Sequence, residues 1–563
     1  MPNDLAIARD AAFLPLRDIA AAMGLSEAFL EPYGRDVAKV RLDAVEALAD
    51  APKAKYVVVS AITPTPLGEG KTTTAIGLAQ GLNRIGRRTT VSLRQPSMGP
   101  TFGIKGGAAG GGYSQVIPME RINLHLTGDI HAVTAAHNLL AAVIDNHLFQ
   151  KGGIDLDPHS ITWRRVLDVN DRALRNVVIG LGGRNDGVSR QSGFEIAAAS
   201  EVMAILALAT SLEDLRARLG RIVVGATRDG EPVTAENLKC AGAMAVLLKD
   251  ALMPNLLQTL ENTPALIHAG PFGNIAHGNS SIIADLVGIR GGDFLVTEAG
   301  FGADMGAERF FNIKCRASGL VPDAAVLVAT VRALKAHSGR FRIVAGKPLP
   351  ATLLAENPDD VRAGADNLRK QIENVRLHGV SPVVAINAFP TDHASEHDAI
   401  REAAEAAGAR VAVCTHAEHG GEGARELAEA VVGAADEAGE FTFLYPDDLP
   451  LDGKIERVAT RVYGADGVEY TAAARRQLDA YAAQGHDHLP VCIAKTHLSL
   501  SSDASLKGAP KGWTLPVREV RLSAGAGFVY ALCGDISTMP GLGAHPGLER
   551  VDLDADGEIL GLS

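Results

Sequence analysis

The sequence has little of what marks disulfide-rich, zinc-binding, secreted or membrane proteins. Only five of its 563 residues are cysteine, with no close pair and no Cys-x-x-Cys motif, so neither a disulfide framework nor a zinc knuckle is indicated. The most apolar long stretch, residues 196–209, contains Glu201 and is too short to span a bilayer. The N-terminus lacks the basic region and apolar core of a signal peptide. We therefore expect a soluble, cytoplasmic protein with no membrane partner.

An excess of positive charge is also missing. The formal net charge is −12, which argues against nucleic acid as a partner. Small anionic substrates stay admissible, because a local basic site can lie inside an acidic protein. Aromatic residues make up only 4% of the chain, whereas 47% of residues are hydrophobic and 21% are charged. This composition predicts large buried cores and excludes a mainly disordered chain.

Apolar runs alternate with alanine-rich amphipathic patterns along nearly the whole chain. The expected buried strands are residues 56–61, 89–93, 177–180, 221–225, 265–269, 294–297, 325–330, 382–387, 409–414 and 491–495. Helical patterns, such as residues 358–378 and 422–438, lie between several of them. Short apolar strands that alternate with helices indicate an α/β fold with mainly parallel sheets. Polar stretches predict boundaries that divide the chain into residues 1–345, 346–450 and 451–563.

The sharpest local pattern is a phosphate-binding loop. The strand at 56–61 runs into a loop rich in Pro and Gly, and Gly70-Lys71-Thr72 then opens a helix, which is the context that a P-loop requires. Unpaired backbone N–H groups at the helix start would bind phosphate, Lys71 would reach the β- and γ-phosphates, and Thr72 would ligate Mg²⁺. The residues expected to bind the nucleotide are Thr65, Pro66, Leu67, Gly68, Glu69, Gly70, Lys71 and Thr72. Thr65 departs from the pattern, which has glycine there.

A glycine-rich segment follows the next strand. Residues 103–113 are Gly-Ile-Lys-Gly-Gly-Ala-Ala-Gly-Gly-Gly-Tyr, and Arg94 lies at the carboxyl end of strand 89–93, where open α/β sheets bind ligands. Such glycines let the backbone approach a ligand closely or let a loop move, and Arg94 and Lys105 add anion-binding chemistry. Further along, His125, Asp129 and His131 leave three alternatives open: metal ligands, polar groups near a substrate, or hydrogen-bonded structural residues.

Four segments together resemble the formate–tetrahydrofolate ligase family, also called 10-formyltetrahydrofolate synthetases. They are residues 63–72, 103–113, 328–335 (Val-Ala-Thr-Val-Arg-Ala-Leu-Lys) and 533–542 (Cys-Gly-Asp-Ile-Ser-Thr-Met-Pro-Gly-Leu), and they span almost the entire chain. The resemblance implies a large N-terminal P-loop domain, which binds the nucleotide and formyl phosphate, and two smaller α/β domains. It also implies a homotetramer that is activated by a monovalent cation.

The resemblance further implies a reaction of one-carbon metabolism. ATP, with Mg²⁺, phosphorylates formate to formyl phosphate, and N10 of tetrahydrofolate then attacks the formyl carbon. The products are 10-formyltetrahydrofolate, ADP and phosphate. Lys71 and Arg94 are the expected catalytic residues, since cations stabilise the charge that develops during phosphoryl transfer. Formyl phosphate is expected to contact Arg94, Lys71, Gly106 and Gly107.

Folate recognition requires a flat slot for the pterin, and aromatic side chains supply one by stacking. By the resemblance, residues 387–392 carry the pterin contact Phe389, and Tyr33 and His416 are further folate-binding candidates. The family generally places a tryptophan shortly before a Gly-Gly pair, but Ala417 stands near that position here. His416 or His419 is a candidate replacement for the missing aromatic ring.

A different class of protein remains compatible with the loop alone. The strand, loop and helix would also suit a P-loop switch or partitioning ATPase, whose output is partner binding, and they do not separate ATP from GTP. The glycine-rich segment with Arg94, together with the Phe389 segment, favours small-molecule chemistry.

Overall fold

The computed structural model describes residues 3–103, 109–344, 347–437 and 439–562. Its centre is one large sheet, in which seven neighbouring strands are parallel. In spatial order these are β14 (Pro264–Ile267), β4 (Thr89–Leu93), β15 (Phe294–Glu298), β3 (Lys55–Ala61), β16 (Ala324–Ala329), β17 (Ser381–Asn387) and β18 (Arg410–Cys414). The sequence predicted a buried strand at each of these seven places. The predicted α/β class with a mainly parallel large sheet is therefore confirmed.

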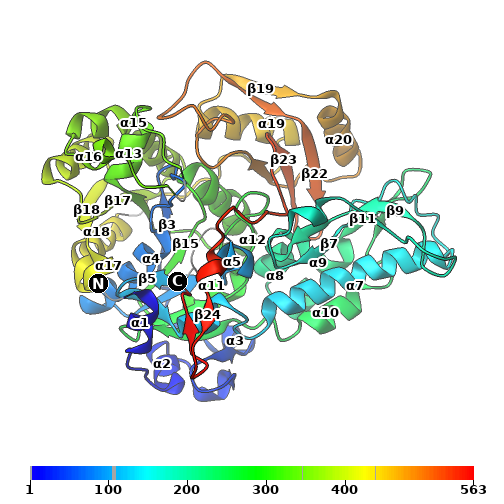
Figure 1. Ribbon diagram of the computed structural model, residues 1–563, viewed down its shortest axis with the longest axis horizontal. Helices are drawn as coiled ribbons and strands as arrows, with labels where there is room; N and C mark the ends of the chain where they lie inside the picture. Colours follow the sequence, from blue (N-terminus) through cyan, green and yellow to red (C-terminus); the bar gives the residue numbers. More distant parts are fainter. Residues whose placement is uncertain (1–2, 104–108, 345–346, 438, 563) are drawn as a thin grey trace.

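Helices cover both faces of these parallel strands (Figure 1). One face packs on α4 (Lys71–Arg84) and α18 (Arg425–Asp436), and the other packs on α13 (Val331–His337) and α15 (Pro358–Arg376). Val57 and Val59 of β3 belong to the first core and Val58 to the second. Because successive side chains of a strand point to opposite faces, a strand buried on both faces must be apolar at nearly every position. This explains why the central strands appear in the sequence as unbroken apolar runs.

The other edge of the sheet is antiparallel. There β13 (Asn255–Thr259) pairs with β14, and β2 (Ala38–Val40) and β1 (Leu30–Pro32) follow in order. The short strands β6 (Ser114–Ile117) and β5 (Gly110–Gly111) branch from β13. This edge carries the start of the chain and the end of the glycine-rich segment.

Three predicted buried strands lie outside the large sheet. Residues 491–495 form β20 (Val491–Ala494), in a three-stranded sheet of the C-terminal part. Residues 177–180 form β8 (Val177–Ile179), which pairs with β9 (Arg190–Ser192) in a two-stranded sheet, and Val178 is 56% exposed. Residues 221–225 contribute to β11 (Val223–Ala226), which pairs with β12 (Pro232–Thr234) in a separate two-stranded sheet. The expectation that residues 177–180 form a buried strand was wrong, because a short apolar run does not reveal how much of it is covered.

A helical lobe projects from the sheet on the right of Figure 1. Its main helices are α7 (Asp129–Phe149), α8 (Glu201–Leu208), α9 (Leu212–Arg221) and α10 (Ala241–Leu248), which share one hydrophobic core. In the described parts of the chain, every helix is too short or too polar to cross a membrane. All five cysteines are buried free thiols, as expected for a chain without a disulfide framework.

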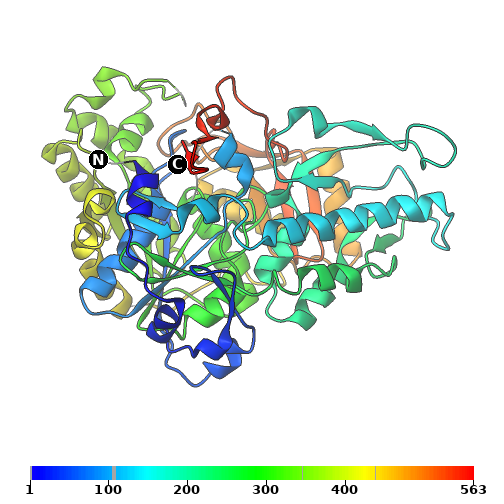
Figure 2. The same cartoon turned by 60° about the horizontal axis from the view of Figure 1, so that its bottom comes forward.

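The C-terminal part, from Tyr445 onward, forms several smaller sheets and has its own hydrophobic core. Strands β20 (Val491–Ala494), β23 (Phe528–Leu532) and β22 (Glu519–Ser523) form one sheet, and α19 (Leu451–Arg457) and α20 (Ala472–Ala483) belong to the same region. The last residues return to the start of the chain, where the Arg9 guanidinium donates to the Ile559 carbonyl at 3.0 Å (Figure 2). Strands β16 and β17, on either side of the predicted boundary at residue 346, are neighbours in one sheet. The three predicted domain ranges stay predictions.

Candidate functional site

The predicted phosphate-binding loop joins β3 to α4 at the carboxyl edge of the parallel strands. Gly70 precedes the helix with φ 76°, and no side chain caps the helix start. A Cβ at this position would lie 2.6 Å from the Asn387 Nδ2 atom, so both the backbone angle and the space require glycine. The first turn of α4 therefore presents its backbone N–H groups and the positive end of the helix dipole at this edge.

Side chains of the loop itself and of other elements hold the loop in place by hydrogen bonds. Glu69 is 1% exposed, and its carboxylate accepts hydrogen bonds from the Thr65 backbone N–H, at 2.7 Å, and from the Thr330 hydroxyl. The Arg332 guanidinium donates to the Gly68 carbonyl at 3.0 Å, and Asn387 Nδ2 donates to the Glu69 carbonyl at 3.1 Å. Because its carboxylate is committed to these bonds, the Glu69 side chain shapes the loop.

One buried carboxylate joins the two halves of the predicted site. Glu298, at the end of β15, is 4% exposed. Its Oε2 accepts a hydrogen bond from the Thr72 hydroxyl at 2.7 Å, and its Oε1 lies 3.5 Å from Arg94 Nε. Strand β15 lies between β3 and β4 in the sheet, so the segments that follow these three strands meet at one place. Glu298 was not predicted as a site residue, although an acidic residue directly after an apolar strand was the available signal.

The glycine-rich segment is described only in part. The predicted formyl phosphate residues Gly106 and Gly107, and also Lys105, lie outside the described residues. In the part that follows, the Tyr113 N–H donates to the Ala417 carbonyl at 2.9 Å, and a Cβ on Gly112 would lie 1.9 Å from that oxygen. The end of the segment therefore packs against the stretch in which the family's second aromatic is missing.

Phe389 follows β17 at the same edge of the sheet as the nucleotide loop. Its ring has the Arg332 guanidinium 4.1 Å from its centroid, and its backbone N–H donates to Asp392 Oδ2 at 2.9 Å. Arg332 therefore contacts both the loop, through Gly68, and the aromatic ring. Arg332 was not predicted as a site residue, although it lies within one of the four segments that carry the resemblance.

The other two folate candidates differ in position, because His416 follows β18, the strand next to β17, whereas Tyr33 follows β1 at the far edge of the sheet. His416 is fully buried against α4, with its Nε2 3.2 Å from the Thr74 hydroxyl oxygen, and burial lowers its pKa to about 4. Tyr33 follows β1, eight strand positions from β17, which is roughly 40 Å along a sheet. Within one chain, a single pterin ring cannot contact both Tyr33 and Phe389. His419 is exposed beside Thr415.

Asp129 belongs to a buried polar network. Its carboxylate accepts a hydrogen bond from Lys39 Nζ at 2.8 Å and another from Asn255 Nδ2 at 2.8 Å. No three His, Cys, Asp or Glu side chains within the described ranges gather as metal ligands. Of the three alternatives for this stretch, Asp129 fits the structural role.

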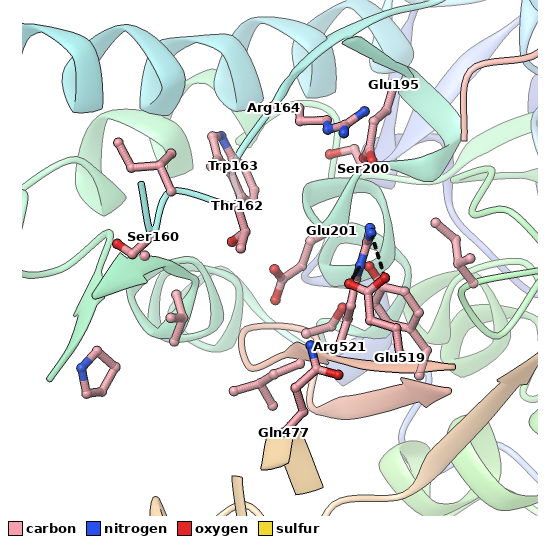
Figure 3. Close-up of a pocket in the computed structure, with 18 of the residues that line it drawn as sticks. Ser160, Thr162, Trp163, Arg164, Glu195, Ser200, Glu201, Gln477, Glu519 and Arg521 are labelled. Carbon is pink, nitrogen blue, oxygen red and sulfur yellow. Dashed lines mark hydrogen bonds and ion pairs between the residues drawn. The ribbon is translucent and has the colours of Figure 1, made fainter. Parts of the chain in front are cut away.

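A cavity of about 520 Å³ lies between the helical lobe and the C-terminal part (Figure 3). Its lining includes Trp163, Arg164, Glu195, Glu201, Tyr530 and Arg521. Burial raises the pKa of Glu201 to about 7, while the backbone N–H groups of Gly525 and Ala526 oppose this shift by donating to its carboxylate. None of the predicted site residues lines this cavity.

Together, the fold and the sheet edge define an α/β protein with an anion-binding helix start beside an arginine and a buried carboxylate. The chain belongs to the formate–tetrahydrofolate ligase family, whose sequence model matches residues 2–563. It is 70% identical over 563 residues to a formate–tetrahydrofolate ligase of Saccharopolyspora erythraea, with complete coverage of both chains. A second ligase, from Cutibacterium acnes, is 65% identical over 562 residues, again with complete coverage. The formate–tetrahydrofolate ligase 3 of Rubrobacter xylanophilus is 67% identical over 572 residues, and both chains are fully covered.

Proposed function

We propose that the chain ligates formate to tetrahydrofolate at the expense of ATP, and that it does so where β3, β4 and β15 end. The observation that carries this site assignment is the convergence of Thr72 and Arg94 on the Glu298 carboxylate, beside the start of α4. Family membership over the whole chain favours this activity over the switch or partitioning ATPase that the loop alone allowed.

ATP binds with its phosphates at the start of α4. The backbone N–H groups of the first turn and the Lys71 ammonium hold the β- and γ-phosphates. Residues 65–72 supply the loop around them. The bonds of Glu69 to Thr65 and Thr330 hold this loop in place before the nucleotide arrives, which reduces the ordering that binding requires.

Magnesium fits the oxygen atoms at this position. The Thr72 hydroxyl and the Glu298 carboxylate are hard oxygen ligands of the kind that Mg²⁺ prefers, and they already lie within hydrogen-bond distance of each other. These two residues would hold the ion, either directly or through water. When bound, Mg²⁺ neutralises charge on the phosphates during transfer.

The first chemical step activates formate. Arg94 holds the formate carboxylate with the planar guanidinium, so that one formate oxygen attacks the γ-phosphorus and ADP leaves. Lys71 and Arg94 stabilise the charge on the transferring group. The resulting formyl phosphate would lie between Arg94, Lys71 and the backbone of Gly106 and Gly107. A carboxylate that resists attack has thereby gained phosphate as a leaving group.

The second step uses the folate side of the edge. The N10 lone pair attacks the formyl carbon, the bond from carbon to the phosphate oxygen breaks, and phosphate leaves while N10 loses its proton. Phe389 stacks on the pterin with the face that Arg332 leaves open. The large P-loop domain with two smaller α/β domains, the homotetramer, the activating monovalent cation and the cytoplasmic location stay expectations from the sequence.

A product assay tests the proposed function. A reaction of ATP, formate and tetrahydrofolate is acidified, and the absorbance of 5,10-methenyltetrahydrofolate reports the 10-formyl product. We expect product only when all three substrates are present. ATP hydrolysis at full rate without formate and without tetrahydrofolate, with no folate product, would contradict the proposal and favour a switch ATPase.

A further inference from the structure

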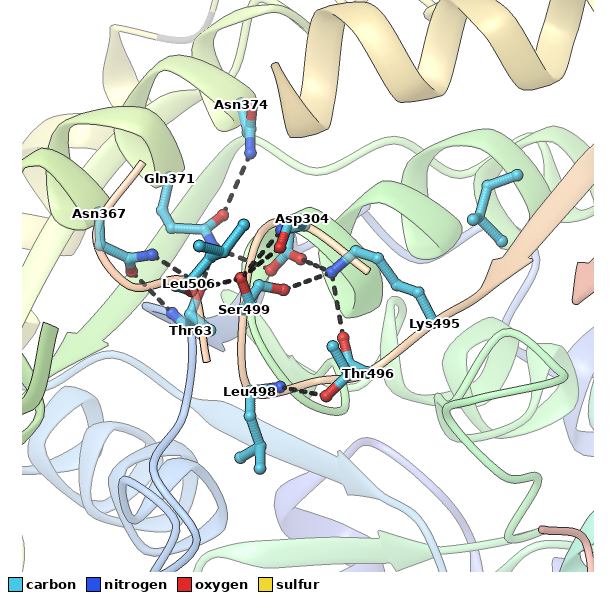
Figure 4. Close-up of polar contacts among 12 residues, drawn as sticks. Thr63, Asp304, Asn367, Gln371, Asn374, Lys495, Thr496, Leu498, Ser499 and Leu506 are labelled. Atoms are coloured by element: carbon cyan, nitrogen blue, oxygen red, sulfur yellow. Dashed lines mark hydrogen bonds and ion pairs between the residues drawn. The ribbon is translucent and has the colours of Figure 1, made fainter. Parts of the chain in front are cut away.

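A chain of buried polar contacts connects the C-terminal part of the molecule to the nucleotide loop (Figure 4). It begins at Lys495, directly after β20, where the ammonium donates to Asp304 Oδ2 at 2.9 Å. The Lys495 side chain is 0% exposed and that of Asp304 is 2% exposed. Lys495 also donates to the carbonyls of Ser499, at 2.6 Å, and Thr496, at 3.2 Å. The pair is therefore fixed on both sides and excluded from water.

The contact continues through an amide to the first residues of the loop. Asp304 Oδ1 accepts a hydrogen bond from Gln371 Nε2 at 2.8 Å, and the same nitrogen lies 3.0 Å from the Thr63 hydroxyl oxygen, to which it also donates. Thr63 lies two residues beyond β3 and begins the segment that leads to Gly70. Three hydrogen bonds among four side chains, from Lys495 to Thr63, thus join elements that are far apart in the sequence.

Thr63 is held at every polar atom. Its N–H donates to Asn367 Oδ1 at 3.0 Å, its carbonyl accepts from His337 Nε2 at 2.8 Å, and its hydroxyl oxygen accepts from Asn367 Nδ2 at 2.9 Å. The segment after Lys495 takes part a second time, because the Gly508 carbonyl accepts from Asn367 Nδ2 at 3.0 Å. The Gly508 N–H also donates to His337 Nδ1 at 3.3 Å, so residues 495–508 reach Thr63 through Asp304 and Gln371, through Asn367, and through His337.

We infer that Lys495 is a positioning residue for the nucleotide loop, and that it acts through Asp304, Gln371 and Thr63. The inference rests on the proposed function, because it requires the nucleotide to bind at residues 65–72. Phosphate-binding N–H groups are effective only when their backbone is fixed, and displacements near 1 Å can cost about a hundredfold in rate. The C-terminal part would thus contribute to ATP binding without touching ATP.

The chain offers a matched control for Lys495. Lys454 in α19 is also 0% exposed, and its ammonium donates to the backbone carbonyls of Asp447, Asp487 and Leu489 at 2.7–3.1 Å. All three partners lie in the C-terminal part. Replacing either lysine with methionine removes a buried ammonium and leaves an unbranched side chain one atom shorter, but of the two lysines only Lys495 is connected to the loop.

The experiment compares substrate KM values for the full chain and its variants. In Lys495→Met we expect the KM for ATP to rise about tenfold, with the KM values for formate and tetrahydrofolate within about twofold of the original. Lys454→Met should lower the melting temperature without changing the KM for ATP. Gln371→Met breaks the link to Thr63 but keeps the Lys495–Asp304 pair, so it should raise the KM for ATP even if Lys495→Met does not fold.

Combining the variants gives the sharpest outcome. Adding Lys495→Met to Gln371→Met should raise the KM for ATP little further, since both changes interrupt one path. An unchanged KM for ATP in folded Gln371→Met, or a rise of equal size in Lys454→Met, would overturn the inference. Failure of the proposed function looks different: the unchanged chain would then form no 10-formyltetrahydrofolate from ATP, formate and tetrahydrofolate. If the unchanged chain forms this product and Gln371→Met has a normal KM for ATP, only the positioning role is rejected.

Discussion

The nucleotide loop and the folate segment lie at the same edge of the sheet but are built differently. The loop is bonded at Thr63, Gly68 and Glu69 by side chains from other elements, and at Thr65 by its own Glu69 side chain. The folate segment offers one half-buried ring, Phe389, with a guanidinium on one face. The difference suits the proposed ligands, because phosphate requires several N–H groups at fixed positions whereas an aromatic ring requires only a flat apolar surface.

This comparison predicts that the two regions respond differently to substitution. Changes at the loop should reduce the rate of phosphoryl transfer strongly, because they act on charge that develops in the transition state. Changes at the folate segment should alter mainly the KM for tetrahydrofolate and by smaller factors.

The largest effect is expected for Lys71→Ala. Removing a cation from a developing phosphoryl charge should cost about 3–5 kcal/mol of transition-state stabilisation, or about two to four decades in kcat/KM. Initial rates with saturating formate and tetrahydrofolate measure it. The exposed Lys53 provides the matched control, and Lys53→Ala should be near normal. Turnover by Lys71→Ala close to that of the unchanged chain would reject the loop assignment.

Glu298→Gln should come next. The substitution keeps the shape and an acceptor for the Thr72 hydroxyl but removes the negative charge near the proposed ion. The Mg²⁺ concentration that gives half-maximal rate should rise about 10- to 100-fold, as for other groups that orient or bind a metal. A titration of rate against Mg²⁺ at fixed ATP measures this shift. The same midpoint in both enzymes would exclude Glu298 from ion binding.

Arg94→Lys tests the formate side of the nucleotide region. Lysine keeps the charge but cannot present two parallel N–H donors to a carboxylate. We expect kcat/KM for formate to fall by about tenfold or more, while ATP binding, measured by calorimetry, survives. If both the KM for formate and kcat are unchanged, Arg94 does not hold formate.

The smallest effects belong to the folate segment. Ala417→Trp places an aromatic near the position where the resemblance implies one, so the KM for tetrahydrofolate should fall by up to about tenfold, since an aromatic pair contributes about 0.5–1.5 kcal/mol. Phe389→Ala should raise that KM and leave those for ATP and formate close to normal. The two changes should be non-additive, because both affect one ring. A rise in the KM for Ala417→Trp, in a folded enzyme, would show that the second face is already closed.

The sequence predicted the parallel strands well, because a strand that is buried on both faces is apolar at nearly every position. Each central strand is an apolar run, and the nucleotide loop carries Gly70 where only glycine fits. The environment of residues 177–180 was not predictable in this way, since a two-stranded ribbon and a buried strand can share the same short pattern.

Residues of the proposed site were predictable from the sequence only where a local motif marks them. Thr72 and Arg94 each follow a strand and were identified from local patterns. Glu298 contacts both Thr72 and Arg94 because β15 lies between β3 and β4 in the sheet. The order of strands in a sheet cannot be predicted from a local motif. His416 has an aromatic ring that could stack on a pterin, but it is buried against α4. No local sequence pattern shows this burial.

The central claim is that formate is activated as formyl phosphate at the nucleotide loop, and labelled oxygen tests it most directly. Formate in which both oxygen atoms are ¹⁸O is incubated with ATP, tetrahydrofolate and the enzyme, and the inorganic phosphate is analysed by mass spectrometry. The mechanism predicts one ¹⁸O atom per phosphate released, because the oxygen that attacks the γ-phosphorus stays with phosphate when N10 takes the formyl group. Formation of 10-formyltetrahydrofolate with unlabelled phosphate would contradict the account.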